Sequence, residues 1–211
     1  MIVNHPRTIE ETLTYLPEGS RPSVEVGFAN DEKEDPPKQI GSMVIQVAAG
    51  KGEGHTTLSA FDAALHAAGV ANYNLVQLSS IIPPGAEIKV YDKGPIADQP
   101  GKWGDRLYVV KADKRVETEG EEAWAAVGWV QDPETGMGLF VEHEGGSKDA
   151  VSRKVEASLE DLIRIRNMKF GEPQVKFAGV TCVDVPVCAL VVAAYRAEGW
   201  EPHAGLQDQP F

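Results

Sequence analysis

Apolar and polar positions alternate with two different periods along the chain, and these periods predict a series of strands and helices. Strands are predicted where apolar residues alternate with polar ones or form a short run, at residues 23–29, 42–50, 74–82, 87–91, 106–111, 123–130, 138–145 and 174–183. Helices are predicted where apolar residues recur every three or four positions, at residues 8–16, 56–69 and 147–168. The run at 185–197 is apolar almost throughout, so it is compatible with a strand, a buried helix, or one leading into the other.

Glycines indicate where two of these elements end. The segment GKGEG at 50–54 predicts a tight turn after the strand at 42–50, because it lacks the spacing of a phosphate-binding loop. Gly69 supplies a C-terminal stop for the helix at 56–69. Strands outnumber helices and do not alternate regularly with them, so we predict an α+β sandwich in a single domain.

The amino-acid composition limits the classes of function that this protein can have. The 211 residues carry a formal net charge of −12, which argues against a nucleic-acid binder, because such a protein needs a basic face. An acidic protein is compatible with a cationic small-molecule ligand. The two cysteines, Cys182 and Cys188, lack the spacing of a metal clip, and the N-terminus lacks an apolar signal sequence. We therefore expect a cytoplasmic protein without a metal.

The stretch NLVQLSSIIPPG at 74–85 combines an extended apolar segment with two adjacent hydroxyl groups. Its β-branched and apolar residues favour a strand, and the two prolines end it because proline has no N–H to donate to a neighbouring strand. Ser79 and Ser80 are therefore either solvated residues at a strand end or part of a chemical site. On spacing alone, the solvated strand end is favoured.

A longer block around these serines carries a family resemblance. The segment GEGHTTLSAFDAALHAAGVANYNLVQLSSIIPPGAEI at 52–88 joins a glycine-rich turn, a helix with a Phe-Asp pair, and the patterns N-x-N-L and S-S-I-x-P-P. Together with GLFVEHEG at 138–145 and the apolar C-terminal run, it resembles the pyruvoyl-dependent arginine decarboxylases. From this resemblance we expect a decarboxylase domain at 42–198, preceded by an N-terminal extension at 1–41 and followed by a tail at 199–211.

The resemblance implies a four-layer αββα sandwich, assembled as a homotrimer or hexamer, and a chain that cuts itself between Ser79 and Ser80. A serine hydroxyl can attack the preceding carbonyl and convert the amide into an ester. Elimination of the Ser79 carboxylate then leaves a dehydroalanine at position 80, and hydrolysis turns this residue into a covalent pyruvoyl group. That ketone forms a Schiff base with a substrate amine and accepts electrons as the α-carboxylate leaves, as pyridoxal phosphate does in other enzymes.

Two further residues match positions near the family's reacting centre. Glu142 is expected to give a proton to the substrate Cα, which requires a raised pKa; the alternative is a surface carboxylate. On a strand, Glu142 and Glu144 share one face while His143 lies on the other, where it packs or is exposed. Asn74 is expected to orient the substrate or to steady the cleavage oxyanion, and the alternative is a residue that closes the turn before the strand.

Three residues are expected to bind the substrate. The resemblance places the substrate's cationic end at Asp62, whose carboxylate suits a guanidinium or ammonium group; a helix-surface carboxylate is the alternative. Leu58 and Tyr73 are expected to line the same pocket, with core packing as the alternative for both.

The sequence thus favours a self-processing decarboxylase of a basic amino acid. L-Arginine, giving agmatine for polyamine metabolism, is the expected substrate, and ornithine or lysine are the alternatives. A second hypothesis is an unprocessed, non-catalytic family member that acts as an assembly partner. The intact residues Ser79, Ser80, Asn74, Asp62 and Glu142 speak against that second hypothesis.

Overall fold

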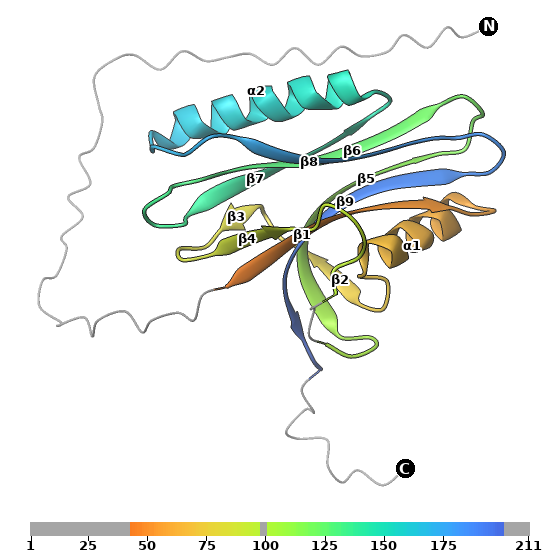
Figure 1. Cartoon of the computed structure of the whole chain (residues 1–211), viewed down its shortest axis with the longest axis horizontal. Helices are drawn as coiled ribbons and strands as arrows, with labels where there is room; N and C mark the ends of the chain where they lie inside the picture. The colour runs from red at the N-terminus through yellow and green to blue at the C-terminus, as the bar shows by residue number, and fades with distance from the viewer. Residues whose placement is uncertain (1–42, 98–100, 201–211) are drawn as a thin grey trace, which may run out of the picture. The chain divides into compact units, whose positions relative to one another are not determined.

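The computed structural model describes residues 43–97 and 101–200, and Figure 1 labels its helices and strands. The elements predicted at 8–16 and 23–29 lie outside these ranges. In chain order the described elements are β1 (Val44–Glu53), α1 (Thr57–Ala68), β2 (Asn74–Gln77), β3 (Ile81–Ile82), β4 (Glu87–Val90), β5 (Arg106–Val116), β6 (Glu122–Gln131), β7 (Gly138–Gly145), α2 (Lys148–Arg166), β8 (Gln174–Thr181) and β9 (Val187–Glu198).

The strands form two sheets. The five-stranded sheet has the order β2-β5-β9-β1-β4, and the four-stranded sheet has the order β3-β7-β6-β8. In the five-stranded sheet, β1 runs parallel to β4 and β2 runs parallel to β5, whereas β9 is antiparallel to both of its neighbours. The described residues therefore form a single α+β domain of two sheets and two helices, as predicted.

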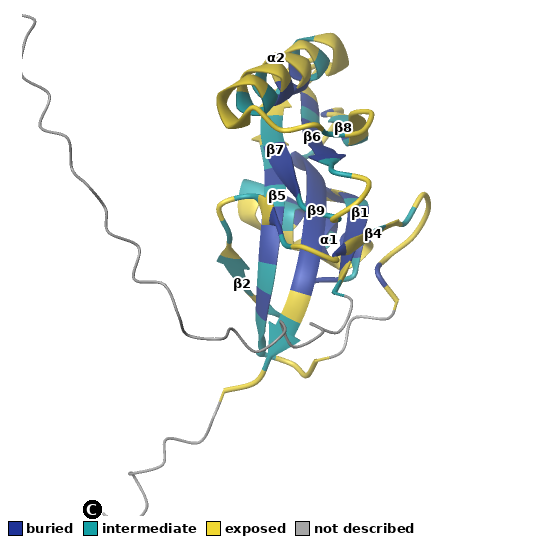
Figure 2. Ribbon diagram, turned by 90° about the vertical axis from the view of Figure 1, so that its left-hand side faces the viewer, coloured by how far each residue is buried: buried dark blue, intermediate teal, exposed yellow. Residues whose placement is uncertain are grey.

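Three apolar clusters hold these elements together. Leu190 belongs to a cluster between α1 and the five-stranded sheet, while Val191 and Phe140 belong to a cluster between the two sheets. Val141 and Val155 belong to a third cluster between the four-stranded sheet and α2. In Figure 1, α1 and α2 accordingly lie on opposite sides of the strands, and Figure 2 shows buried strands beneath the exposed outer surface of α2.

The apolar run at 185–197 is a strand. Successive residues of β9 face opposite clusters, and the strand is buried from Val187 to Tyr195. A strand that is buried on both faces has no polar face, so its sequence lacks the alternation that would have identified it.

The helix at 56–69 is confirmed, and its buried face consists mainly of alanines. Thr56 caps the N-terminus of α1, and Gly69 ends the helix with a φ of 85°. The buried residues are three alanines and one leucine (Ala60, Ala64, Leu65 and Ala68). Leu58 is 69% exposed, so the core-packing alternative for this residue is wrong.

The tight turn predicted at 50–54 is wrong, because β1 continues to Glu53. A Cβ atom at Gly50 would lie 2.0 Å from the carbonyl oxygen of Ala64, and one at Gly52 would lie 2.2 Å from that of Ala60. These glycines therefore let α1 approach β1 closely, and the alanines of α1 keep the contact short.

The single strand predicted at 74–82 is also wrong. β2 pairs with β5 in the five-stranded sheet, whereas β3 pairs with β7 in the four-stranded sheet. Residues 78–80 connect the two sheets, and Ser80 has a φ of 70°. Both halves of the segment favour extended backbone, so the residue preferences alone did not indicate the break.

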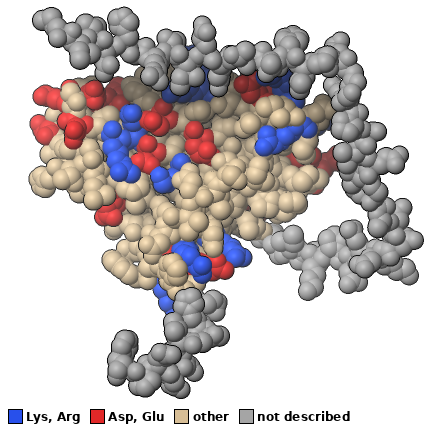
Figure 3. Space-filling model, turned by 180° about the vertical axis from the view of Figure 1, so that it is seen from behind, with Lys and Arg blue, Asp and Glu red and all other residues tan. Residues whose placement is uncertain are grey.

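Charges of both signs are interspersed on the surface seen in Figure 3. No helix within residues 43–97 and 101–200 is both long and apolar enough to span a membrane. Cys182 and Cys188 are both buried free thiols.

Candidate active site

The pair Ser79-Ser80 lies where the chain passes from one sheet to the other. The backbone N–H of Leu78 donates to the carbonyl of Val109 on β5 at 2.8 Å. On the other side of the pair, the N–H of Phe140 on β7 donates to the carbonyl of Ser80 at 2.8 Å. These two hydrogen bonds hold the backbone on either side of the serine pair. Between them Ser80 adopts a positive φ, which costs a non-glycine residue about 1–3 kcal/mol.

Glu142 contacts Ser80 directly. The Ser80 hydroxyl donates a hydrogen bond to Oε1 of Glu142, which lies half-buried on β7. Burial raises the pKa of the Glu142 carboxyl, and the hydrogen bond from Ser80 offsets part of this rise. The protonated form of Glu142 is therefore more populated near neutral pH than that of an exposed glutamate.

The side chains of β7 alternate as predicted. Glu144 lies on the same face as Glu142 and forms an ion pair with Lys114 of β5 at 3.1 Å. His143 lies on the other face, where its Nε2 is 2.7 Å from the hydroxyl of Ser158 on α2. Burial and the charge of Lys154 lower the pKa of His143. His143 thus packs against α2.

A pocket of about 480 Å³ opens beside Ser80 and Glu142. It exists because β3 pairs only with Gly138 and Leu139, which leaves the rest of that edge of β7 without a neighbouring strand. The residues that line it come from positions 79–81, from β7 and from α2 (Ser79, Ser80, Ile81, Leu139, Phe140, Val141, Glu142, His143, Ser158, Asp161, Leu162 and Arg166). The volume is in the usual range for small-molecule sites.

Tyr195 of β9 reaches this region from the opposite sheet, and no sequence pattern predicted this position. Its hydroxyl donates to the carbonyl of Ile81 at 2.9 Å, and its ring packs edge-on against Phe140 with a centroid distance of 6.2 Å. Burial and the charge of Glu142 raise the pKa of the Tyr195 phenol. No local pattern could have identified this residue, because its partner lies more than a hundred positions earlier in the chain.

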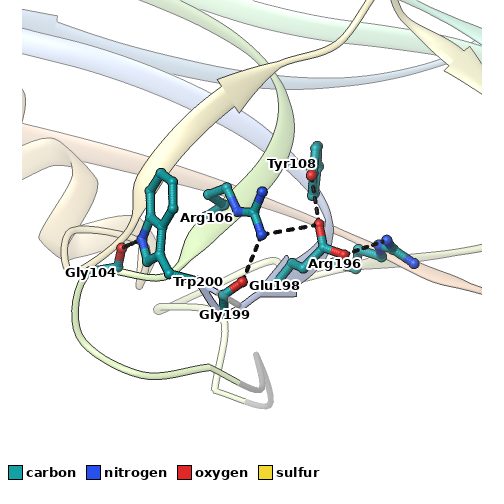
Figure 4. Close-up of polar contacts among 7 residues, drawn as sticks. All are labelled: Gly104, Arg106, Tyr108, Arg196, Glu198, Gly199 and Trp200. Atoms are coloured by element: carbon teal, nitrogen blue, oxygen red, sulfur yellow. Dashed lines mark hydrogen bonds and ion pairs between the residues drawn. The ribbon is translucent and has the colours of Figure 1, made fainter. Parts of the chain in front are cut away.

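Asn74 begins β2 and joins it to the loop that precedes β5. Its Nδ2 donates to the carbonyl of Gly104 at 2.6 Å, and its backbone N–H donates to the carbonyl of Asp105 at 2.8 Å. The Gly104 carbonyl also accepts a hydrogen bond from Nε1 of Trp200 at 2.9 Å, and the Trp200 ring stacks on Arg106 (Figure 4). Asn74 is not among the residues that line the Ser80 pocket.

The three predicted substrate-binding residues are also absent from the lining of the Ser80 pocket. Leu58 and Asp62 are exposed on α1, which covers the face of the five-stranded sheet that is turned away from the four-stranded sheet. Tyr73 borders a separate hollow of about 360 Å³. Burial and the charge of Asp105 raise its pKa. The structure thus separates two groups of predicted site residues, one around Ser80 and Glu142 and one on or beside α1 (Leu58, Asp62 and Tyr73), while Asn74 belongs to neither.

Among residues 43–97 and 101–200, no three histidine, cysteine, aspartate or glutamate side chains gather closely enough to hold a metal ion.

Comparison with known proteins gives consistent matches. The model of the family described as pyruvoyl-dependent arginine decarboxylase matches residues 44–196. A pyruvoyl-dependent arginine decarboxylase from Halobacterium salinarum is 36% identical over 155 residues, which cover 72% of this chain and 92% of the relative. The enzyme of that name from Thermococcus kodakarensis is 35% identical over 147 residues, which cover 69% and 90% of the two chains.

A solved structure of a pyruvoyl-dependent histidine decarboxylase matches less well. The TM-score is 0.32 at 19% sequence identity, over 49% of this chain and 54% of that chain. This agreement is too low to support an argument.

Proposed function

Because the chain belongs to the pyruvoyl-dependent arginine decarboxylase family, we propose that it is a self-processing enzyme that converts L-arginine into agmatine and CO₂ for polyamine metabolism. Ornithine and lysine are the alternative substrates. The observation that carries the proposal is the contact of the Ser80 hydroxyl with Glu142, at a residue with a positive φ and beside a pocket. A serine at a solvated strand end would be exposed to water and would not contact a half-buried carboxylate.

This arrangement supports self-cleavage. The Ser80 hydroxyl, held by its hydrogen bond to Glu142, attacks the carbonyl carbon of Ser79, and its proton passes to the Ser80 nitrogen as the C–N bond breaks. The peptide bond becomes an ester, and elimination of the Ser79 carboxylate leaves a dehydroalanine at position 80. Hydrolysis of this residue releases ammonia and leaves a ketone. The positive φ raises the energy of the uncut chain and so favours its conversion.

The residues around position 80 fit a pyruvoyl group. The carbonyl of residue 80 accepts the Phe140 N–H, so a donor already faces the oxygen that would be conjugated with the ketone. When present, the group accepts the electron pair that is released as the substrate carboxylate leaves. Glu142 holds a proton beside this centre and delivers it to the substrate Cα, a role suited to its raised pKa.

The separation of the two residue groups supports a site shared between protomers. We propose that four-layer αββα protomers, formed by residues 42–198, assemble as a trimer or hexamer. Asp62 and Leu58 of one protomer would then meet the Ser80 pocket of a neighbour, with Tyr73 and Asn74 nearby. Leu58 is an exposed apolar side chain, which is the kind of residue that such an interface buries. The carboxylate of Asp62 would bind the cationic end of the substrate.

Intact-mass measurement tests the proposal. The purified protein should consist of chains 1–79 and 80–211, the second blocked to N-terminal sequencing. Ser80→Ala should remain whole and inactive, because no hydroxyl is left to attack, while Ser152→Ala on α2 should be cut normally. Amine products should then be measured with arginine, ornithine and lysine side by side. Active protein that consists only of uncut chain would refute the proposal, and an inactive uncut wild type would favour the non-catalytic assembly partner.

A further inference from the structure

The carbonyls of Ser80 and Ile81 are held from different sheets. Because β3 is an edge strand, its carbonyls point alternately toward β7 and away from it. The carbonyl of Ser80 points toward β7 and accepts the Phe140 N–H. The carbonyl of Ile81 accepts instead the hydroxyl of Tyr195, which belongs to the five-stranded sheet.

Tyr195 is well placed to fix this segment. Its side chain is 7% exposed, and its ring contacts Phe140, the residue that holds the neighbouring carbonyl. Tyr195 does not line the pocket beside Ser80. Its side chain therefore lies behind residues 79–81 and would not contact a bound substrate.

We propose that Tyr195 is a positioning residue for Ser80, acting through the carbonyl of Ile81. This inference rests on the proposed self-cleavage. Without the phenol hydroxyl, the Ile81 carbonyl would lose its partner, and β3 would keep only its short ladder with β7. Ser80 could then relax from its positive φ, and its hydroxyl would leave Glu142. A displacement of about 1 Å in a reacting group slows a reaction by about 100-fold, so we expect cleavage to slow by about 10- to 100-fold.

The variant Tyr195→Phe tests this role, because it removes only the hydroxyl and keeps the ring against Phe140. The matched control is Tyr108→Phe, which removes a phenol hydroxyl that donates to Glu198 at 2.7 Å, far from the pocket lining. Conversion of uncut chain into two chains should be followed over time after cell-free synthesis. Tyr195→Phe should be slow, and Tyr108→Phe should match the wild type.

Two further measurements separate positioning from a general loss of stability. In a Ser80→Ala background, where all proteins stay uncut, both tyrosine variants should shift the thermal midpoint to a similar extent. In cut protein, Tyr195→Phe should lower kcat and leave KM nearly unchanged, because the phenol does not line the pocket.

Three outcomes would overturn the inference. If wild type and Tyr195→Phe are cut at the same rate, Tyr195 has no positioning role, although the proposed function stands. If Tyr195→Phe is slow but also lowers the thermal midpoint far more than Tyr108→Phe does, the hydroxyl supports the fold in general. If the wild type is not cut at all, both the proposed function and the inference fail.

Discussion

Replacing Glu142 with glutamine should separate formation of the cofactor from its use. The substitution keeps the shape of the side chain and the oxygen that accepts the Ser80 hydroxyl, but it removes the acidic proton. Self-cleavage and decarboxylation make different demands on this one residue, so the two reactions should respond by different amounts.

The expected magnitudes follow from the contact. A hydrogen bond to a charged acceptor is stronger than one to a neutral acceptor by about 1 kcal/mol, so cleavage of Glu142→Gln should slow by only about fivefold. A positioned general acid contributes about 10²- to 10⁴-fold to a rate, so turnover should fall by that much. The mutant should therefore accumulate as two chains that turn over poorly.

The assay combines intact mass, which reports cleavage, with agmatine release from the cut protein. Glu144→Gln is the matched control, because Glu144 lies on the same strand face and loses only an exposed ion pair with Lys114, worth about 0–1 kcal/mol. If Glu142→Gln keeps full turnover and Glu144→Gln is impaired, then Glu144 and not Glu142 donates the proton to the substrate Cα. A Glu142→Gln chain that stays uncut would place the role of Glu142 in cofactor formation.

The remaining predictions concern substrate binding, packing and pH. Asp62→Asn should raise KM about 10- to 100-fold, the effect of losing about 1.5–3 kcal/mol of charge-assisted binding, and should leave cleavage unchanged; an unmoved KM would make Asp62 a helix-surface residue. Gly52→Ala should lower the free energy of unfolding by about 1–3 kcal/mol, whereas Gly146→Ala, where the nearest atom is 3.9 Å from the new Cβ, should be tolerated. Burial raises the pKa of Glu142 above its ordinary value of 4.5, so its protonated form stabilises the fold at low pH and this contribution is lost as pH rises through the raised pKa. In a Ser80→Ala background, Glu142→Gln should therefore gain stability relative to Glu142 from about pH 4.5 upward, and a constant difference across pH 4–8 would contradict the raised pKa.

Local signals predicted the helices and much of the sheet. Thr56 and Gly69 mark the ends of α1, and the alternation of GLFVEHEG predicted β7 with the observed bounds. The same alternation placed Glu142 and His143 on opposite faces, as the contacts of both residues confirm.

The sequence did not predict features that depend on distant parts of the chain. The break between β2 and β3 arises because each half finds a partner strand in a different sheet, and nothing in the residues themselves opposes one continuous strand. Leu58 has the spacing of a core residue, but Gly50 and Gly52 draw the alanine face of α1 toward β1 instead. Tyr195 meets Ile81 only through the packing of the two sheets.

The passage of the chain between sheets at residues 78–80 has a consequence for refolding. A cut after Ser79 would leave β1 and β2 on one polypeptide and β4, β5 and β9 on the other, yet β1 lies between β9 and β4, and β2 lies along β5. The two polypeptides would therefore share one sheet and could separate only by unfolding. Folding of the uncut chain is a unimolecular reaction, whereas refolding of the cut protein requires two molecules to meet, so its rate and yield depend on protein concentration. The working lifetime of the cut protein is then governed by how slowly it unfolds.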